Sequence, residues 1–307
     1  MVATPATAGR QAGLRRAIRR AAAPSQLLFN LALVALSFAV LFPVLWAVSS
    51  SLKGPKELFE AVPSLWVREP TLANYEYMWT RMGNVPVYFR NSIVVGVGTV
   101  LLTVVTASLA GYAFARMAFR GRDALFLFLV MLLFVPRSGG LMALYELMNF
   151  LGLRNSLLGL ILLFSAALSV PIFIMRQTFL ALPRELEEAA RIDGATWPQV
   201  FRHIAVPLGA PGMVVVAIFT FVRVWGDFLV TLTMIDKDAM MTIAIGVRKL
   251  GTAGISAFFA GSALTGRFAT YGADAALYLI AMAPVVVVWI LLQRWFMRGM
   301  TEGVLKF

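Results

Sequence analysis

The sequence contains no cysteine and only one histidine, His203. Without cysteine the chain can form no disulfide, thiolate nucleophile or cysteine metal site, and a single histidine cannot make a histidine-based metal centre. The Gly-x-x-x-x-Gly-Lys-Ser/Thr loop that binds nucleotide phosphates is also absent, so any ATP chemistry must take place on another chain. We therefore expect a chain that is not an enzyme and that holds no cofactor or metal of its own.

Charged residues are scarce as well. Only 14% of the residues are charged and 60% are hydrophobic, whereas soluble proteins carry about 25% charged residues. A soluble protein of this composition would expose large apolar patches to water. The net charge of +12 does not indicate a nucleic-acid partner, because the basic residues lie between apolar runs instead of forming one stripe. The composition predicts an all-α membrane protein.

Six apolar stretches predict six transmembrane helices, since about 20 helical residues cross a hydrocarbon core of about 30 Å. The third stretch has only thirteen uncharged residues and can span only if the flanking charged side chains reach the interface. A further segment, 250–266, is rich in Gly, Ala and Ser, and we expect it to be an external re-entrant or surface segment. The six expected spans cover residues 27–48, 91–115, 124–136, 155–175, 211–235 and 275–293.

The distribution of Lys and Arg predicts the orientation. Residues 1–26 carry five arginines and no acidic residue, and short loops rich in Lys and Arg stay in the cytoplasm. We therefore expect residues 1–26 to be a basic cytoplasmic tail, residues 27–307 to be the transmembrane domain, and both termini to be cytoplasmic.

The loop between spans four and five, residues 176–210, carries the most specific local pattern. Pro183 suits the first position of a helix, and the acidic residues after it favour the positive end of the helix dipole. Gly194 is placed to end this helix in the left-handed conformation. Thr196 and Gln199 have the capping-box spacing of a second helix. These features alone predict a short helical hairpin at the membrane surface.

The residue spacing in this loop also resembles a family motif. The spacing resembles the EAA motif of ABC importer permeases, E-A-A-x3-G-x9-I-x-L-P. In this chain the pattern reads Glu188-Ala189-Ala190, three residues, Gly194, nine residues, Ile204, one residue and Val206-Pro207. Val206 replaces the usual leucine. The string from Glu187 to Pro211 is similar to the carbohydrate-uptake branch and its MalG-like permeases, and the resemblance covers roughly residues 27–307.

The resemblance implies a type I ABC importer permease fold in which the EAA helix couples to a cytoplasmic ATPase subunit. It further implies a MalF-like second permease, two ATP-binding cassette subunits that carry ATP and Mg, an extracytoplasmic solute-binding protein, and a place in a bacterial or archaeal cytoplasmic membrane. The implied function is uptake of a sugar or related polyol by alternating access. The implied coupling residues are Glu188, Ala189, Ala190, Arg191, Asp193, Gly194, Ile204 and Pro207.

Two groups of residues have alternative interpretations. Arg223, Trp225 and Asp227 in span five are candidates for the substrate path, because charges at membrane depth are often functional. Arg223 and Asp227 are four residues apart, however, and an intrahelical ion pair is the alternative. The aromatic and acidic external segment 53–90 either contacts the binding protein or forms an interfacial aromatic belt.

The function itself also has alternatives. An ABC permease for a glycerol phosphate, an amino acid or a peptide would share the EAA loop. A stand-alone secondary transporter or channel would need no ATPase, but it would leave the EAA spacing unexplained and would usually contain internal repeats.

Overall fold

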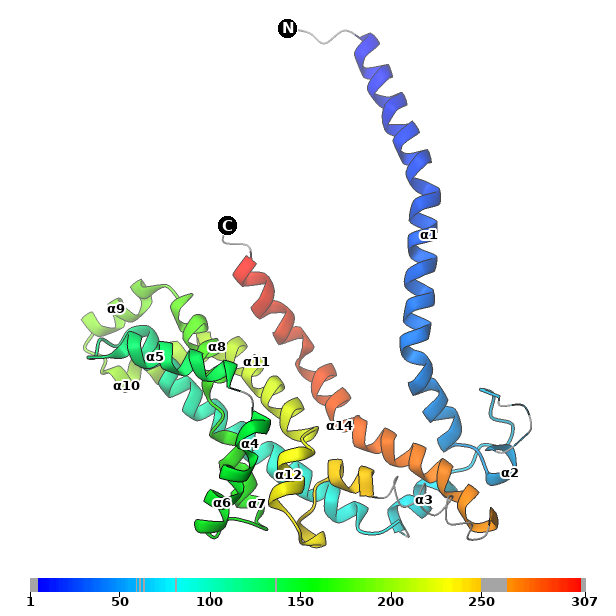
Figure 1. The fold of residues 1–307 in the computed structure, drawn as a ribbon. Coiled ribbons are helices and arrows are strands. Elements are labelled where there is room, and N and C mark those ends of the chain that lie inside the picture. Colours follow the sequence, from blue (N-terminus) through cyan, green and yellow to red (C-terminus); the bar gives the residue numbers. More distant parts are fainter. Residues whose placement is uncertain are drawn as a thin grey trace.

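The computed structural model describes residues 5–58, 60, 62, 64–80, 82–135, 137–249 and 264–304, and among these every regular element is a helix (Figure 1). A helix satisfies its backbone hydrogen bonds within one segment, as a chain in hydrocarbon must. The α-helices are α1 (Pro5–Ser51), α2 (Pro55–Leu58), α3 (Ala73–Thr80), α4 (Val85–Arg116), α5 (Arg122–Met131), α6 (Leu141–Phe150), α7 (Leu157–Ser165), α8 (Ser169–Leu180), α9 (Arg184–Ile192), α10 (Trp197–Val200), α11 (Val206–Trp225), α12 (Leu229–Met234) and α14 (Leu264–Val304).

Five of the six expected spans have a counterpart in the structure. Four helical segments are long and apolar enough to cross a membrane: 26–51 of α1, the whole of α4, 197–225 from α10 to α11, and 271–295 of α14. The fifth counterpart is the pair α7 and α8, whose axes differ by 51° across a short break. The predicted all-α membrane fold is confirmed.

The third predicted span, 124–136, is not one continuous helix. α5 ends at Met131 after ten residues, a length of about 15 Å. The 3-10 turns Leu132–Phe134 and Arg137–Gly140 separate it from α6. Thirteen uncharged residues are too few for an independent crossing, and the structure divides this part of the chain among several short helices.

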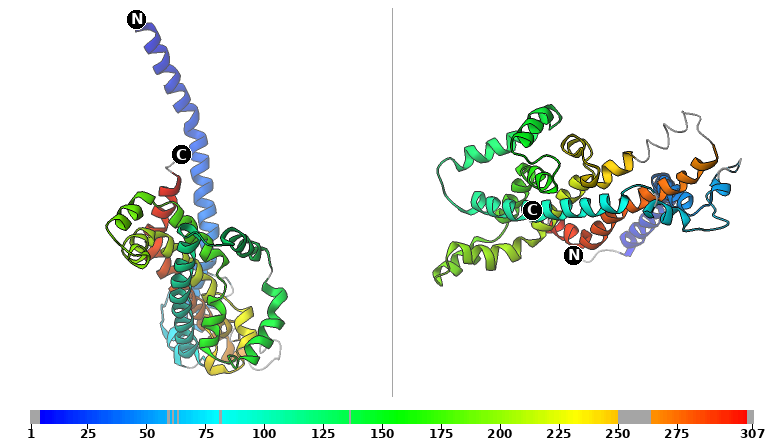
Figure 2. Two further views of the ribbon diagram at one scale, coloured as in Figure 1. Left: turned by 90° about the vertical axis from the view of Figure 1, so that its left-hand side faces the viewer. Right: turned by 90° about the horizontal axis from the view of Figure 1, so that it is seen from below.

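The expected basic tail, residues 1–26, and the first span are continuous in the structure. α1 begins at Pro5 and continues for 47 residues, so the basic residues and the first span share one helix. α1 packs against α14 and its last residue, Ser51, is hydrogen-bonded to Asn74 and Tyr75 of α3, whereas its N-terminal part extends away from the bundle (Figures 1 and 2). Of the predicted external segment 250–266, residues 250–263 lie outside the described residues, and the remaining three begin α14.

α4 is the central helix of the bundle, and it packs against α7, α8 and α11. Glycines allow these close contacts: a Cβ on Gly98 would lie 2.7 Å from Ile161 Cδ1, and one on Gly111 would lie 2.6 Å from Met175 Cβ. All three buried apolar clusters include residues of α4. The helix therefore connects the two ends of the molecule.

The two ends carry different elements. α9, α10 and the C-terminal end of α4 lie at one end of the bundle, whereas α3, α6 and the N-terminal end of α4 lie at the other (Figure 1). The N-terminal end of α1 and the C-terminal end of α14 lie on the α9 side (Figure 1).

Candidate functional site

The predicted hairpin is present between α8 and α11. α9 follows Pro183 and ends at Ile192, and Gly194 adopts a φ of +88° that lets the chain reverse. The Thr196 amide then donates to Gln199 Oε1 at 2.7 Å, which forms the predicted capping box before α10. Short-range chemistry thus sets the shape of the hairpin.

One face of the hairpin is open to solvent. Ile192, an apolar residue in the middle of the motif, is 86% exposed. The Arg191 guanidinium lies 4.4 Å from the centre of the Trp197 ring and so orients the turn. An exposed isoleucine beside charged groups is typical of a surface that another protein covers. The motif residues exposed on this face are Glu188, Ala189, Arg191, Asp193 and Gly194.

A cleft of about 370 Å³ lies between α9 and the chain that follows α10. It combines the small Ala190, the carboxylate of Asp193 and the apolar side chain of Ile204. The first half of the motif and Ile204 are therefore brought together in space, as a single recognition surface requires. The lining residues that matter here are Ala190, Asp193, Gly194, Gln199, His203 and Ile204.

Glu187 holds the hairpin against the transmembrane bundle. Its carboxylate accepts from Arg116 Nε at 2.9 Å and from the Tyr112 hydroxyl at 3.2 Å. Arg116 also donates from Nη2 to the Leu182 carbonyl oxygen at 2.7 Å. We name Glu187, Arg116 and Tyr112 the Glu187 cluster. Helix-dipole considerations alone do not predict this contact of Glu187, but the arginine and tyrosine one turn apart at the end of span two are a signal for an acidic partner.

The chain after α10 contains a π-helix, Phe201–Ala205, before α11 begins. Pro207 lies in the first turn of α11 and Pro211 lies inside it. Ile204 is therefore in the π-helix and Pro207 is the second residue of the helix that follows, so the second half of the motif lies at irregular helical geometry. π-helical turns inside α-helices are frequent at functional sites.

The substrate-path candidates are separated by the end of a helix. Arg223 Nη2 donates to the Phe164 carbonyl oxygen at 2.9 Å, and Trp225 Nε1 donates to the Ala281 carbonyl oxygen at 2.8 Å. α11 ends at Trp225, and the Asp227 carboxylate accepts from the Thr231 amide at 3.0 Å. Asp227 lies beyond the end of α11, so Arg223 and Asp227 do not share one helix as the alternative of an intrahelical pair assumed. The assignment of the three residues to a substrate path stays a prediction.

At the opposite end, α4 is joined to the segment after α12. The Tyr88 hydroxyl donates to Asp238 Oδ1 at 2.6 Å, and Asp238 also accepts from Asn84 and Lys249. The hydrogen bonds from Lys249 and Tyr88 lower the pKa of the Asp238 carboxyl from 3.8 to about 2. Asn91 Nδ2 donates to the Ala239 and Met241 carbonyl oxygens, each at 2.9 Å.

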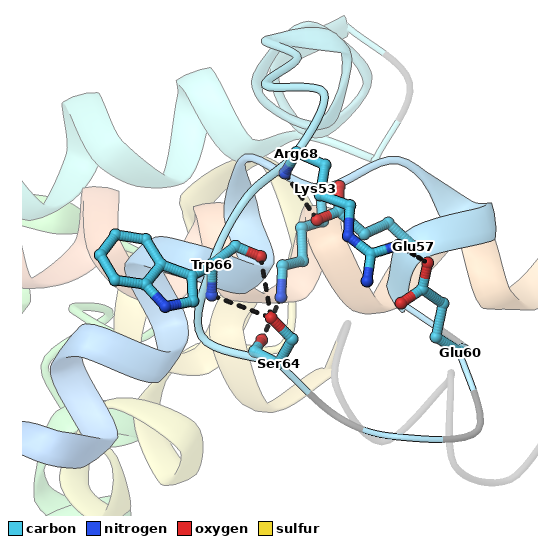
Figure 3. Close-up of polar contacts among 6 residues, drawn as sticks. All are labelled: Lys53, Glu57, Glu60, Ser64, Trp66 and Arg68. Atoms are coloured by element: carbon cyan, nitrogen blue, oxygen red, sulfur yellow. Dashed lines mark hydrogen bonds and ion pairs between the residues drawn. The ribbon is translucent and has the colours of Figure 1, made fainter.

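The loop after α1 is held to the end of that helix, and Trp66 lies beside Ser64 in this loop (Figure 3). Ser49 Oγ donates to the Leu65 carbonyl oxygen at 2.7 Å, and the buried Lys53 donates to the Ser64 carbonyl oxygen. The Arg68 amide donates to Glu57 Oε1 at 2.8 Å on the other side of the loop. Trp66 is 85% exposed.

Comparisons with known proteins agree with this geometry. Residues 22–302 match the family described as "Binding-protein-dependent transport system inner membrane component". The arabinooligosaccharides transport system permease protein AraQ of Halalkalibacterium halodurans is 31% identical over 88% of this chain and 93% of its own length. The trehalose transport system permease protein SugB of Mycobacterium tuberculosis is 32% identical over 87% of this chain and 92% of its own length.

The fold has a solved counterpart. A chain in the crystal structure of a bacterial ABC transporter involved in the import of the acidic polysaccharide alginate matches with a TM-score of 0.77. The match covers 88% of this chain and 95% of the other, at 19% sequence identity. At this identity the match supports the fold alone.

Proposed function

Because the chain belongs to the family of binding-protein-dependent transport system inner membrane components, we propose that it is the permease subunit of an ATP-driven importer for a sugar or a related polyol. The observation that carries the proposal is the hairpin with its exposed EAA face and the adjoining cleft. The chain itself supplies a path through the membrane and no catalytic group.

The exposed face of α9 is the proposed contact for a partner ATPase subunit. Hydrolysis of ATP with Mg takes place on two such subunits, and closure of the two moves the hairpin. Glu188 and Asp193 offer negative charge to a basic partner surface, and Ile192 offers apolar area. We also propose that the hairpin, the start of α1 and the end of α14 face the cytoplasm of a bacterial or archaeal cell; their position on one side of the bundle supports this. A homologous MalF-like permease completes the path within the lipid bilayer.

The substrate class rests on the relatives. The printed names of three of them refer to arabinooligosaccharides, trehalose and diacetylchitobiose, and the last of these, from Streptomyces coelicolor, is 31% identical over 94% of this chain and 93% of its own length. We therefore propose an oligosaccharide or related polyol for this chain in preference to an amino acid or a peptide.

The proposal is tested by purification of the tagged chain in mild detergent and identification of the subunits that accompany it. We expect an ATP-binding subunit and a second permease, and ATP-dependent uptake of a sugar when the complex and its binding protein are reconstituted in liposomes. Recovery of the chain alone, with uptake that needs no ATP, would instead establish a secondary transporter.

The external loop provides a further prediction, since we propose that it contacts the solute-binding protein. Exposed tryptophans at protein interfaces often contribute about 2 kcal/mol or more to binding. Trp66→Ala is therefore expected to raise the concentration of binding protein needed for half-maximal stimulation of the ATPase by about 30-fold. ATP hydrolysis without the binding protein should stay at the parent level.

Leu72→Ala serves as the control, because Leu72 is also an exposed apolar residue of this external region. It should change the half-maximal concentration much less than Trp66→Ala does. If Trp66→Ala leaves that concentration unchanged but lowers the amount of protein in the membrane, Trp66 belongs to an interfacial aromatic belt and the proposed contact is wrong.

A further inference from the structure

We propose that α4 transmits movement of the α9–α10 hairpin to the opposite end of the protein, and that Glu187 is the positioning residue that joins the hairpin to α4. The inference rests on the proposed function, because it assumes that a partner ATPase moves the hairpin. The inference gives a role to three residues outside the EAA motif, Glu187, Arg116 and Tyr112. Transmission then depends on two joints, which are the contacts at the two ends of α4, and each can be tested separately.

The joint at the hairpin end is buried and charged. The side chains of Arg116 and Glu187 are only 4% and 8% exposed. Loss of one partner would leave the other charge buried without compensation, which is strongly destabilising. Hydrogen bonds between charged groups are also shorter and more directional than neutral ones. The Glu187 carboxylate therefore cannot move away from α4 without a large increase in free energy. We expect α9 and the C-terminal end of α4 to move together.

Aromatic packing reinforces this joint. The Tyr112 ring meets the Phe179 ring edge-on at 5.4 Å between centroids and lies 5.0 Å from the Phe201 ring. Phe179 is in α8 and Phe201 opens the π-helix. Both connections of the hairpin to the bundle therefore pass beside Tyr112 of α4.

The covalent route from α10 into α11 is less suited to transmit force. It passes through the π-helix Phe201–Ala205 and then through Pro207 and Pro211. Each proline lacks the amide that would hydrogen-bond to the carbonyl four residues earlier, so the helix can bend at these points. α4 contains no proline after Pro86 and runs for 32 residues, about 48 Å. The stiffer path is therefore α4.

The joint at the other end fixes α4 to the segment 238–243. Besides Tyr88 with Asp238, the two hydrogen bonds of the Asn91 amide hold the backbone at Ala239 and Met241. The Ile243 amide donates to Ser92 Oγ at 2.8 Å. A shift of α4 along its axis must carry this external segment with it.

The experiment uses the complex purified with its partner subunits and exploits the absence of cysteine in this chain. Lys237→Cys places a single attachment site for a spin label on an exposed residue beside the segment 238–243. The spectrum is recorded without nucleotide and after hydrolysis of ATP in the presence of vanadate, which traps ADP on the ATPase subunits. It is recorded first in otherwise parental protein and then with Glu187→Gln or Glu187→Ala added. Uptake per ATP hydrolysed is measured in parallel.

With Glu187 intact, we expect trapping to change the mobility of the label. Glu187→Ala should retain ATP hydrolysis, abolish the change at the label and lower uptake per ATP by about tenfold or more, a loss that corresponds to at least about 1.4 kcal/mol of coupling. Glu187→Gln, which preserves the shape and an acceptor for Tyr112, should have an intermediate effect. The exchange Glu187→Arg with Arg116→Glu should recover part of the coupling that either single change removes.

Glu185→Ala is the matched control, since it removes the same charge from the same helix at an exposed position, and it should respond as the parent does. If the label in Glu187→Ala still responds to vanadate trapping as in the parent, α4 is not the route and the inference is wrong. The inference is also wrong if trapping leaves the label unchanged in a parent complex that couples uptake to ATP hydrolysis. If no ATPase co-purifies, the proposed function itself fails.

Discussion

Gly194→Val is expected to leave the complex assembled and hydrolysing ATP while solute uptake falls by at least about tenfold, because the valine cannot adopt the turn without strain. The φ of Gly194 is +88°, and no atom lies within 4 Å of the position that a Cβ would take. The cost therefore arises in the backbone and not in a steric collision. Relief of the strain must change the angle between α9 and α10, and the EAA face would then meet the ATPase in the wrong orientation. The ratio of uptake to hydrolysis in proteoliposomes measures the effect.

Gly152→Val is the matched control for this experiment. Gly152 also has a positive φ, +66°, and open space around its Cβ position, but it lies in the turn between α6 and α7 at the other end of the molecule. A similar backbone strain there should lower thermal stability without separating hydrolysis from uptake. Normal uptake by Gly194→Val would refute the role of the turn, and equal uncoupling by both variants would attribute the effect to general destabilisation.

The hairpin could be predicted from the sequence because its determinants are local. Pro183, Gly194 and the pair Thr196 and Gln199 act within a few residues of their own positions. The contact of Glu187 with Arg116 joins residues 71 positions apart. Periodicity and capping rules contain no information on such a pair, so the residue that fixes the hairpin in space was missed while the hairpin itself was found.

The sequence predicted which segments are helical better than it predicted where the helices are interrupted. The apolar pattern continues from α11 into α12, and hydropathy alone therefore predicted one span over 211–235. In the structure Gly226 ends α11, and the Asp227 carboxylate accepts from the backbone amide of Thr231. An aspartate that bonds to the backbone in this way competes with helix continuation. A hydropathy window cannot represent that competition, and the same limit applies to the short helices that replace the third span.

Gly111→Leu is expected to prevent accumulation of folded protein in the membrane. A Cβ at Gly111 would lie 2.6 Å from Met175 Cβ, 2.9 Å from the Arg176 amide nitrogen and 3.0 Å from the Met175 carbonyl carbon. Two of these atoms belong to the backbone of α8 and cannot rotate away, so α4 and α8 would have to separate. Insertion of even a few methylenes into a packed core typically costs about 1–3 kcal/mol, which is a large fraction of a total stability of about 5–15 kcal/mol.

Gly98→Ala tests whether the effect depends on the backbone contact. The nearest atom to a Cβ at Gly98 is Ile161 Cδ1, at 2.7 Å, and this atom is the end of a flexible side chain that can change rotamer. Gly98→Ala should therefore accumulate, with a melting temperature within a few degrees of the parent, whereas Gly111→Leu should give little monodisperse protein on size-exclusion chromatography. Because Gly111 lies one residue from Tyr112, separation of α4 from α8 would also open the Glu187 cluster. A Gly111→Leu protein that accumulates and melts like the parent would mean that the approach of α4 to α8 is not needed for the fold, and the rigid connection inferred through α4 would lose its structural basis.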